Sequence, residues 1–145
     1  MKIKFILPVL CFLLLGINSV KAQSSQSTDR THKIIIQLTS GDTLAWKGVL
    51  KNITNLFEVW GDKVKIELVA HGHGVEFLVN GKTTEEKRIQ ELAAKGVQFR
   101  ACENSLRDRK LSKQDVIGAA STVPSGVAEV VMKEEDGWSY LKAGF

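Results

Sequence analysis

Motifs that identify the common enzyme classes are missing from this sequence. It contains no G-x-S-x-G, no G-x-x-x-x-G-K-[ST] and no G-x-G-x-x-G, so nothing supports an acyl hydrolase, a nucleotide hydrolase or a dinucleotide-binding enzyme. No run of lysine and arginine is interleaved with aromatic residues, as a nucleic-acid-binding surface would require. We therefore expect no nucleic-acid partner.

Cysteine is also scarce, with only Cys11 and Cys102 in 145 residues. Cys11 lies in residues 1–22, which have a basic start, an apolar run and a small-residue end before Gln23. This pattern predicts a secretory signal peptide, whose apolar run is too short to remain as a membrane anchor. Cleavage would remove Cys11 and leave Cys102 without an intrachain disulfide partner. We expect an exported protein, periplasmic or extracytoplasmic, with no stable membrane anchor.

The mature chain has the size of one domain. Removal of 22 residues from 145 leaves 123, and the loss of Lys2, Lys4 and Lys21 reduces the net charge of +4 to +1. Residues 23–32 are polar and without apolar periodicity, which predicts a flexible N-terminus. The folded domain is expected over residues 33–145.

Strand and helix patterns alternate along this domain. Apolar, β-branched runs predict strands at residues 33–40, 63–70, 97–101, 119–123 and 138–144. Helical spacing and capping residues predict helices at residues 42–61, 75–79, 83–96, 103–110, 112–117 and 125–137. The alternation predicts an α/β fold with an open, mainly parallel five-stranded sheet and helices on both faces.

Ligands of such sheets collect beyond the carboxyl ends of the strands, where Cys102 is expected. If a helix starts at Glu103, the free N–H groups of Glu103, Asn104 and Ser105 would stabilise a thiolate and lower the pKa of Cys102. A buried cysteine acting as a small apolar group is the structural alternative. The residues alone leave these two interpretations open.

His71 and His73 follow the second predicted strand. If the strand geometry continued, both rings would project from one side, where they could move protons, bind an anion or contribute to a metal site with Cys102. A glycine-rich turn with one histidine bonded to backbone is equally compatible with the pattern. Residues 121–126 similarly suit an anion site or, as we prefer, a turn and helix cap.

The order of these features resembles the DsrE/DsrF-like family. The resemblance spans residues 33–143 and rests on the opening strand and helix and on "ELVAHGHGVEFLV", "KGVQFRACENSLRDRKLS" and "VPSGVAEVVMKEEDGWSYLKAG". It implies a three-layer α/β/α sandwich that assembles as a trimer or hexamer. Sulfur-relay members carry a sulfane sulfur on a cysteine after a central strand, and "RACENSL" places Cys102 at that position.

The resemblance implies that Cys102 is a persulfide carrier and His71 its proton partner or anion donor. His73, Glu103, Asn104 and Ser105 are the expected ligand-binding residues, a sulfur donor or acceptor protein is the expected partner, and no cofactor or metal is expected. Relay members are cytoplasmic, whereas this chain has an export signal, so the donor, the acceptor and any enzymatic activity stay open. The alternative is a non-catalytic oligomeric module that binds a small molecule or metal, with an inert or ligating cysteine.

Overall fold

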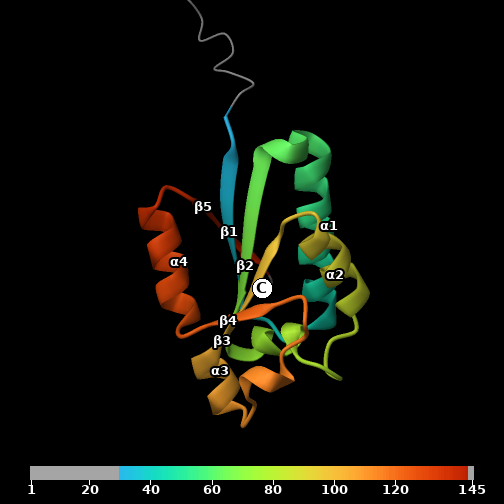
Figure 1. Ribbon diagram of the computed structural model, residues 1–145, viewed down its shortest axis with the longest axis vertical. Coiled ribbons are helices and arrows are strands. Elements are labelled where there is room, and N and C mark those ends of the chain that lie inside the picture. Colours follow the sequence, from blue (N-terminus) through green and yellow to red (C-terminus); the bar gives the residue numbers. More distant parts are fainter. Residues whose placement is uncertain (1–29, 144–145) are drawn as a thin grey trace, which may run out of the picture.

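A computed structural model describes residues 30–143 of the protein (Figure 1). The predicted signal peptide and most of the predicted flexible N-terminus lie outside the described residues. Within the described part, no helix has both the length and the apolar character needed to cross a membrane.

Five parallel strands form one sheet with the order β4-β3-β2-β1-β5. Their bounds are β1 His32–Leu38, β2 Val64–Ala70, β3 Gln98–Cys102, β4 Ser121–Val123 and β5 Ser139–Ala143. Each agrees with a predicted strand to within a few residues. β5 lies at an edge of the sheet, and its residues from Ser139 to Lys142 are exposed. The predicted parallel α/β architecture is confirmed.

Helices cover both faces of this sheet. Figure 1 shows α1 (Thr43–Trp60) and α2 (Glu86–Ala94) on one face and α4 (Gly126–Glu135) on the other, with α3 (Glu103–Asp108) below the carboxyl ends of the strands. The remaining helical segments are 3-10 turns, η1 Gly61–Lys63, η2 Gly72–Leu78 and η3 Lys113–Asp115. The segments predicted as helices at 75–79 and 112–117 therefore contain 3-10 turns, η2 and η3, in place of α-helices.

The ends of α1 follow from its sequence. Asp42 is the N-cap, and its side chain accepts the backbone N–H of Leu44 at 2.8 Å. Gly61 ends the helix with a positive φ of 57°, a conformation that glycine adopts without a steric penalty.

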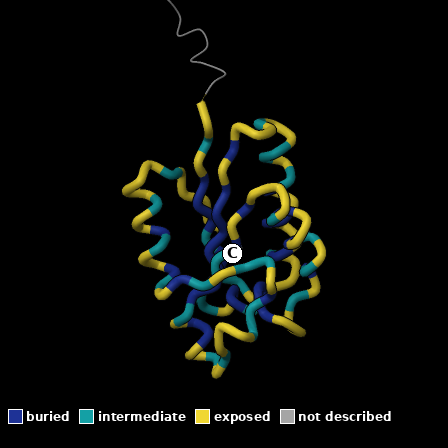
Figure 2. Tube along the Cα trace, viewed as in Figure 1, coloured by how far each residue is buried: buried dark blue, intermediate teal, exposed yellow. Residues whose placement is uncertain are grey.

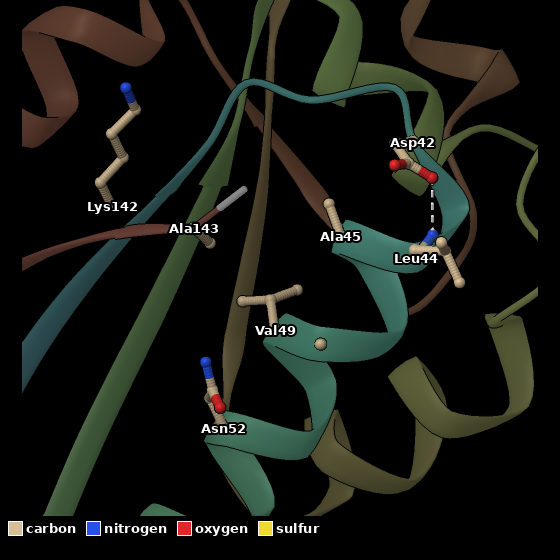
Figure 3. Close-up of a pocket in the computed structure, with 8 residues that line it drawn as sticks. Asp42, Leu44, Ala45, Val49, Asn52, Lys142 and Ala143 are labelled. Carbon is tan, nitrogen blue, oxygen red and sulfur yellow. Dashed lines mark hydrogen bonds between the residues drawn. The ribbon is translucent and has the colours of Figure 1, made fainter. Parts of the chain in front are cut away.

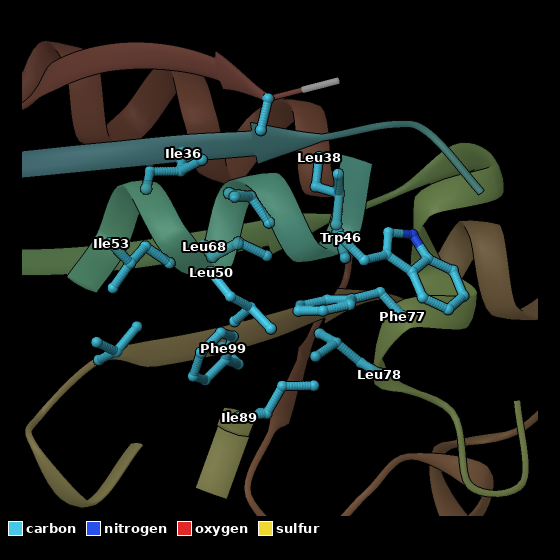
Figure 4. Packing of buried hydrophobic residues seen from close by; sticks show 14 of the residues in the cluster. Ile36, Leu38, Trp46, Leu50, Ile53, Leu68, Phe77, Leu78, Ile89 and Phe99 are labelled. Carbon is cyan, nitrogen blue, oxygen red and sulfur yellow. The ribbon is translucent and has the colours of Figure 1, made fainter. Parts of the chain in front are cut away.

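The two faces of the sheet differ in how much apolar surface they bury. Between the sheet and α1 and α2 lies a large cluster that includes Ile36, Leu50, Phe77 and Phe99 (Figure 4). On the α4 face, the described residues form a smaller apolar cluster of Ile35, Val69, Val123 and Val130, against which Trp138 packs. Figure 2 shows a largely exposed α4 beside the buried central strands.

Alternation along the strands determines which side chains face α4. Ile35 and Val69 belong to the α4 cluster, so Gln37 and Glu67, two residues away on β1 and β2, share that face. The polar residues Gln37 and Glu67 therefore lie among apolar strand residues on the α4 face of the sheet. Cys102 also meets this side, as its contact with the first residue of α4 shows.

Candidate functional site

Cys102 joins the end of β3 to the start of α3. It lies at the strand-to-helix junction that the sequence predicts, as the N-cap of the helix and as the last residue of the strand, one residue beyond the predicted strand end. Its side chain is buried, with 4% of the residue exposed. Its Sγ accepts the backbone N–H of Gly126, the first residue of α4, at 3.2 Å. The thiol is thus enclosed between two helix starts beneath the carboxyl end of the sheet.

The surroundings of this thiol favour its ionised form. Burial by itself acts to raise the pKa of Cys102. Hydrogen bonds to the sulfur act in the opposite direction, and they come from the Ser105 hydroxyl and from the backbone N–H groups of Gly126, Ser105 and Asn104. The donors prevail, so the pKa of Cys102 lies below the ordinary value of a thiol.

Ser105 connects the thiol to the turn after β2. Its hydroxyl acts to lower the pKa of Cys102, and its Oγ accepts the backbone N–H of Gly72 at 2.8 Å. Ser105 is itself buried. Of the predicted N–H groups, those of Asn104 and Ser105 reach the sulfur, and the Ser105 hydroxyl is an additional donor that the sequence analysis did not consider.

Glu103 is directed to other partners. Its carboxylate accepts the Thr122 hydroxyl at 2.8 Å and pairs with Lys113 at 2.6 Å. The pKa of Glu103 is lowered by these two groups, and its backbone N–H is not among the donors that lower the pKa of Cys102. The predicted ligand role of Glu103 therefore receives no support from its described contacts.

His71 lies next to Cys102 at the end of β2. A β-carbon placed on Gly126 would come 3.0 Å from Cβ of His71 and 3.2 Å from Cβ of Cys102. The β-carbons of His71 and Cys102 therefore both lie beside Gly126, where a larger residue would crowd them. Burial lowers the pKa of His71 from its ordinary value, which favours a neutral imidazole.

The His71 ring is held from β1 and β5. Its Nε2 is 2.7 Å from Nε2 of Gln37, and the Tyr140 hydroxyl donates to Oε1 of the same Gln37 side chain. Sequence reasoning did not select Gln37 or Tyr140. The signal available was that Gln37 is the one polar residue in the apolar stretch from Ile34 to Leu38.

His73 lies apart from His71, because the strand ends at Ala70 and η2 begins at Gly72 with a φ of 54°. The alternation that would have placed both rings on one side does not continue. A β-carbon on Gly41 would be 3.4 Å from Cβ of His73, and the His73 charge acts on Glu76. Within residues 30–143, His, Cys, Asp and Glu side chains form no group of three or more that could hold a metal.

A separate groove lies on the opposite side of the sheet. It has a volume of about 400 Å³ between α1 and the end of β5, and its lining includes Asp42, Val49, Asn52 and Lys142. Figure 3 shows Ala45 and Val49 along the α1 wall of this groove. Neither Cys102 nor His71 lines it, so it is distinct from the thiol site.

Comparison with known proteins gives one family. The model of the DsrE/DsrF-like family matches residues 33–143, which confirms the resemblance seen in the sequence. The structure is similar to that of a protein of unknown function, MTH1491 from Methanobacterium thermoautotrophicum, with 28% identity, a TM-score of 0.73, and coverage of 77% of this chain and 98% of that one.

A second similar structure shows the fold alone. It is the conserved protein of unknown function BT1422 from Bacteroides thetaiotaomicron, with 14% identity, a TM-score of 0.57, and coverage of 76% of this chain and 93% of that one. No protein with a curated description matches the sequence.

Proposed function

Since the chain belongs to the DsrE/DsrF-like family, we propose that it is a sulfur carrier that holds a sulfane sulfur as a persulfide on Cys102. The observation that carries the proposal is the set of hydrogen-bond donors on the Cys102 sulfur, which lower the pKa of a buried thiol. A cysteine that served only as an apolar filler would need none of these donors, and burial would raise its pKa.

The transfer step follows thiol–disulfide chemistry. The Cys102 thiolate attacks the outer sulfur of a donor persulfide R–S–SH, a new S–S bond forms on Cys102, and the donor leaves as R–S⁻. The product is Cys102–S–SH, whose outer sulfur passes to an acceptor thiolate by the same exchange. The N–H groups that stabilise the thiolate then stabilise the thiolate released when Cys102 gives up its sulfur.

Burial restricts which donors reach the sulfur. With 4% of Cys102 exposed, a donor must present its sulfur on a narrow group, such as a cysteine persulfide on an extended segment or an inorganic polysulfide. Bulky disulfides are expected to react slowly with this thiol because access limits the exchange rate.

Mass spectrometry tests the carrier function directly. Incubation of mature protein with a polysulfide should add about 32 daltons, the mass of one sulfur atom, and a reducing agent should remove it. The Cys102→Ser variant is the matched control because it keeps the size of the side chain and loses the thiol. An absent adduct on wild type, or an equal adduct on the variant, would rule out the proposal.

We further propose that the carrier acts outside the cytoplasm. The support is the signal-peptide pattern of residues 1–22. A fusion of the full chain to a reporter enzyme that is active only after export should be active, and deletion of residues 2–22 should abolish that activity. Equal activity of both fusions would contradict export.

A homo-oligomer, a trimer or hexamer, is proposed for the mature protein. The family resemblance supports it, and so does the outer surface of α4, where Val127, Val131 and Met132 are between 47% and 56% exposed. Light scattering after size-exclusion chromatography should give three or six chain masses. A monomer at micromolar concentration would contradict this assembly.

A further inference from the structure

Gln37 lies in an unusual place for an amide side chain. It is on β1, on the face covered by α4, and connects two other parts of the sheet, His71 just after the end of β2 and Tyr140 near the start of β5. Tyr140 pairs in register with Ile35 and Lys142 with Gln37. The Tyr140 hydroxyl donates to Oε1 of Gln37, which directs the amide nitrogen to His71.

The direction of this amide determines which ring nitrogen of His71 carries a proton. The Gln37 amide nitrogen has only hydrogen atoms to offer, so the His71 Nε2 that lies 2.7 Å away must accept. A neutral imidazole that accepts at Nε2 has its proton on Nδ1. Nδ1 is also the ring nitrogen closer to the β-carbon, and the β-carbons of His71 and Cys102 lie 3.0 and 3.2 Å from the point that a β-carbon on Gly126 would occupy.

We propose that Gln37, held by Tyr140, is a positioning residue that fixes His71 as a neutral imidazole with an N–H at Nδ1, so that His71 donates a hydrogen bond to sulfur anions on Cys102 and does not act as their base. The inference rests on the proposed function only in taking Cys102 as the working group. It decides between the two roles that the sequence leaves open for His71, proton partner or anion donor.

The charged and titratable groups around His71 agree with a neutral ring. Cys102 lies beside it at the end of β3, and Tyr140 on β5 reaches it through Gln37. None of them brings a negative carboxylate to the ring, and burial is the cause that lowers the pKa of His71. A neutral donor stabilises a thiolate or persulfide anion without a proton being transferred.

Nuclear magnetic resonance of ¹⁵N-labelled mature protein reads the tautomer without any sulfur donor. At pH 8, His71 should show a protonated Nδ1 and an unprotonated Nε2, with its signals assigned by their loss in His71→Ala. In Gln37→Glu, the new carboxylate should accept from Nε2 and raise the pKa of His71. The control Gln90→Glu adds the same charge on the exposed surface of α2 and should leave His71 unchanged. A protonated Nε2 in wild type would overturn the proposal.

Two substitutions of His71 test the donor by thiol reactivity. An asparagine amide nitrogen occupies nearly the position of Nδ1, and a glutamine amide nitrogen nearly that of Nε2. His71→Asn should keep the iodoacetamide rate at pH 7 within about threefold of wild type, while His71→Gln should reduce it about tenfold, the factor that one pKa unit produces. The opposite order would overturn the proposal.

These experiments distinguish the carrier function of Cys102 from the positioning role of Gln37. If wild type has the Nδ1–H tautomer and the expected alkylation order but forms no persulfide, only the carrier function is wrong. If the persulfide forms and the tautomer is Nε2–H, only the role of Gln37 is wrong.

Discussion

Gly126 donates its backbone N–H to the Sγ of Cys102 at 3.2 Å, which joins the first residue of α4 to the last residue of β3. This contact links the position of a whole helix to the ionisation of one thiol. A β-carbon on residue 126 would come 3.0 to 3.2 Å from atoms of His71, Val69 and Cys102, so these neighbours would have to shift to admit one.

Gly126→Ala should therefore displace the start of α4. The expected cost is about 1–3 kcal/mol of unfolding free energy, as for overpacking of a close contact, together with a higher pKa of Cys102 because its N–H donor moves away. Urea unfolding and the pH dependence of alkylation measure the two effects. Gly48→Ala is the control, because a β-carbon there meets nothing within 4 Å and should stabilise α1 by about 0.5–1 kcal/mol. Equal effects of both substitutions would contradict the packing argument.

Ser105→Ala should make the thiol less reactive at neutral pH. The substitution removes a hydroxyl donor from the Cys102 sulfur and the acceptor of the Gly72 N–H, so the pKa of Cys102 should rise toward that of a free thiol. The alkylation rate at pH 7 should fall by about tenfold for each pKa unit, while the rate at pH 10 should change little. Ser139→Ala, on the exposed part of β5, should leave the profile unchanged. An unchanged profile in Ser105→Ala would show that its hydroxyl does not affect the thiol.

Glu67 should make stability depend on pH. Burial raises the pKa of this carboxyl above its ordinary 4.5, although Lys133 opposes the effect, and Lys133 and Arg100 lie 3.0 and 3.6 Å from it. A raised folded-state pKa stabilises the fold fully below the unfolded-state pKa, and this stabilisation is lost as the pH rises through the folded-state value.

Glu67→Gln should consequently gain stability relative to wild type as the pH rises from 4 to 7, because glutamine has no proton to lose. Denaturant unfolding at the two pH values measures the change. Glu86→Gln, on the exposed first turn of α2, should show no such pH-dependent gain. A difference between wild type and Glu67→Gln that stays constant with pH would contradict the raised pKa.

The main core depends on Phe77, which η2 inserts between Trp46 and Phe99 at ring-centroid distances of 5.7 and 6.3 Å. Phe77→Ala should cost about 3–5 kcal/mol of unfolding free energy, because it removes a fully buried ring and leaves a cavity. Val59→Ala, at a position on α1 that is 71% exposed, should change it by less than about 0.5 kcal/mol. Thermal and urea unfolding give both values, and similar costs would contradict this description of the core.

Much of the fold could be predicted because its signals are local. The β-branched run that begins at Lys33, the N-cap Asp42 and the N-cap Ser125 each have a physical consequence within a few residues. The 3-10 turns were predicted less well. In η2, Gly72 turns the chain and Gly74 packs against the end of β1. A β-carbon on Gly74 would lie 2.3 Å from the Leu38 carbonyl oxygen. This close packing depends on a strand that is distant in the sequence, so local patterns do not reveal it.

By itself, the sequence determined the alternation of strands and helices, the family resemblance and the position of Cys102 at a strand-to-helix junction. It did so because apolar spacing, caps and motifs are properties of neighbouring residues. Only the tertiary structure decided which groups surround the thiol. Gly126, Gln37 and Tyr140 reach the site from α4, β1 and β5, so the strand order brings them together. The same packing turned His73 away from His71, because the strand geometry of β2 ends at Ala70 and η2 begins at Gly72.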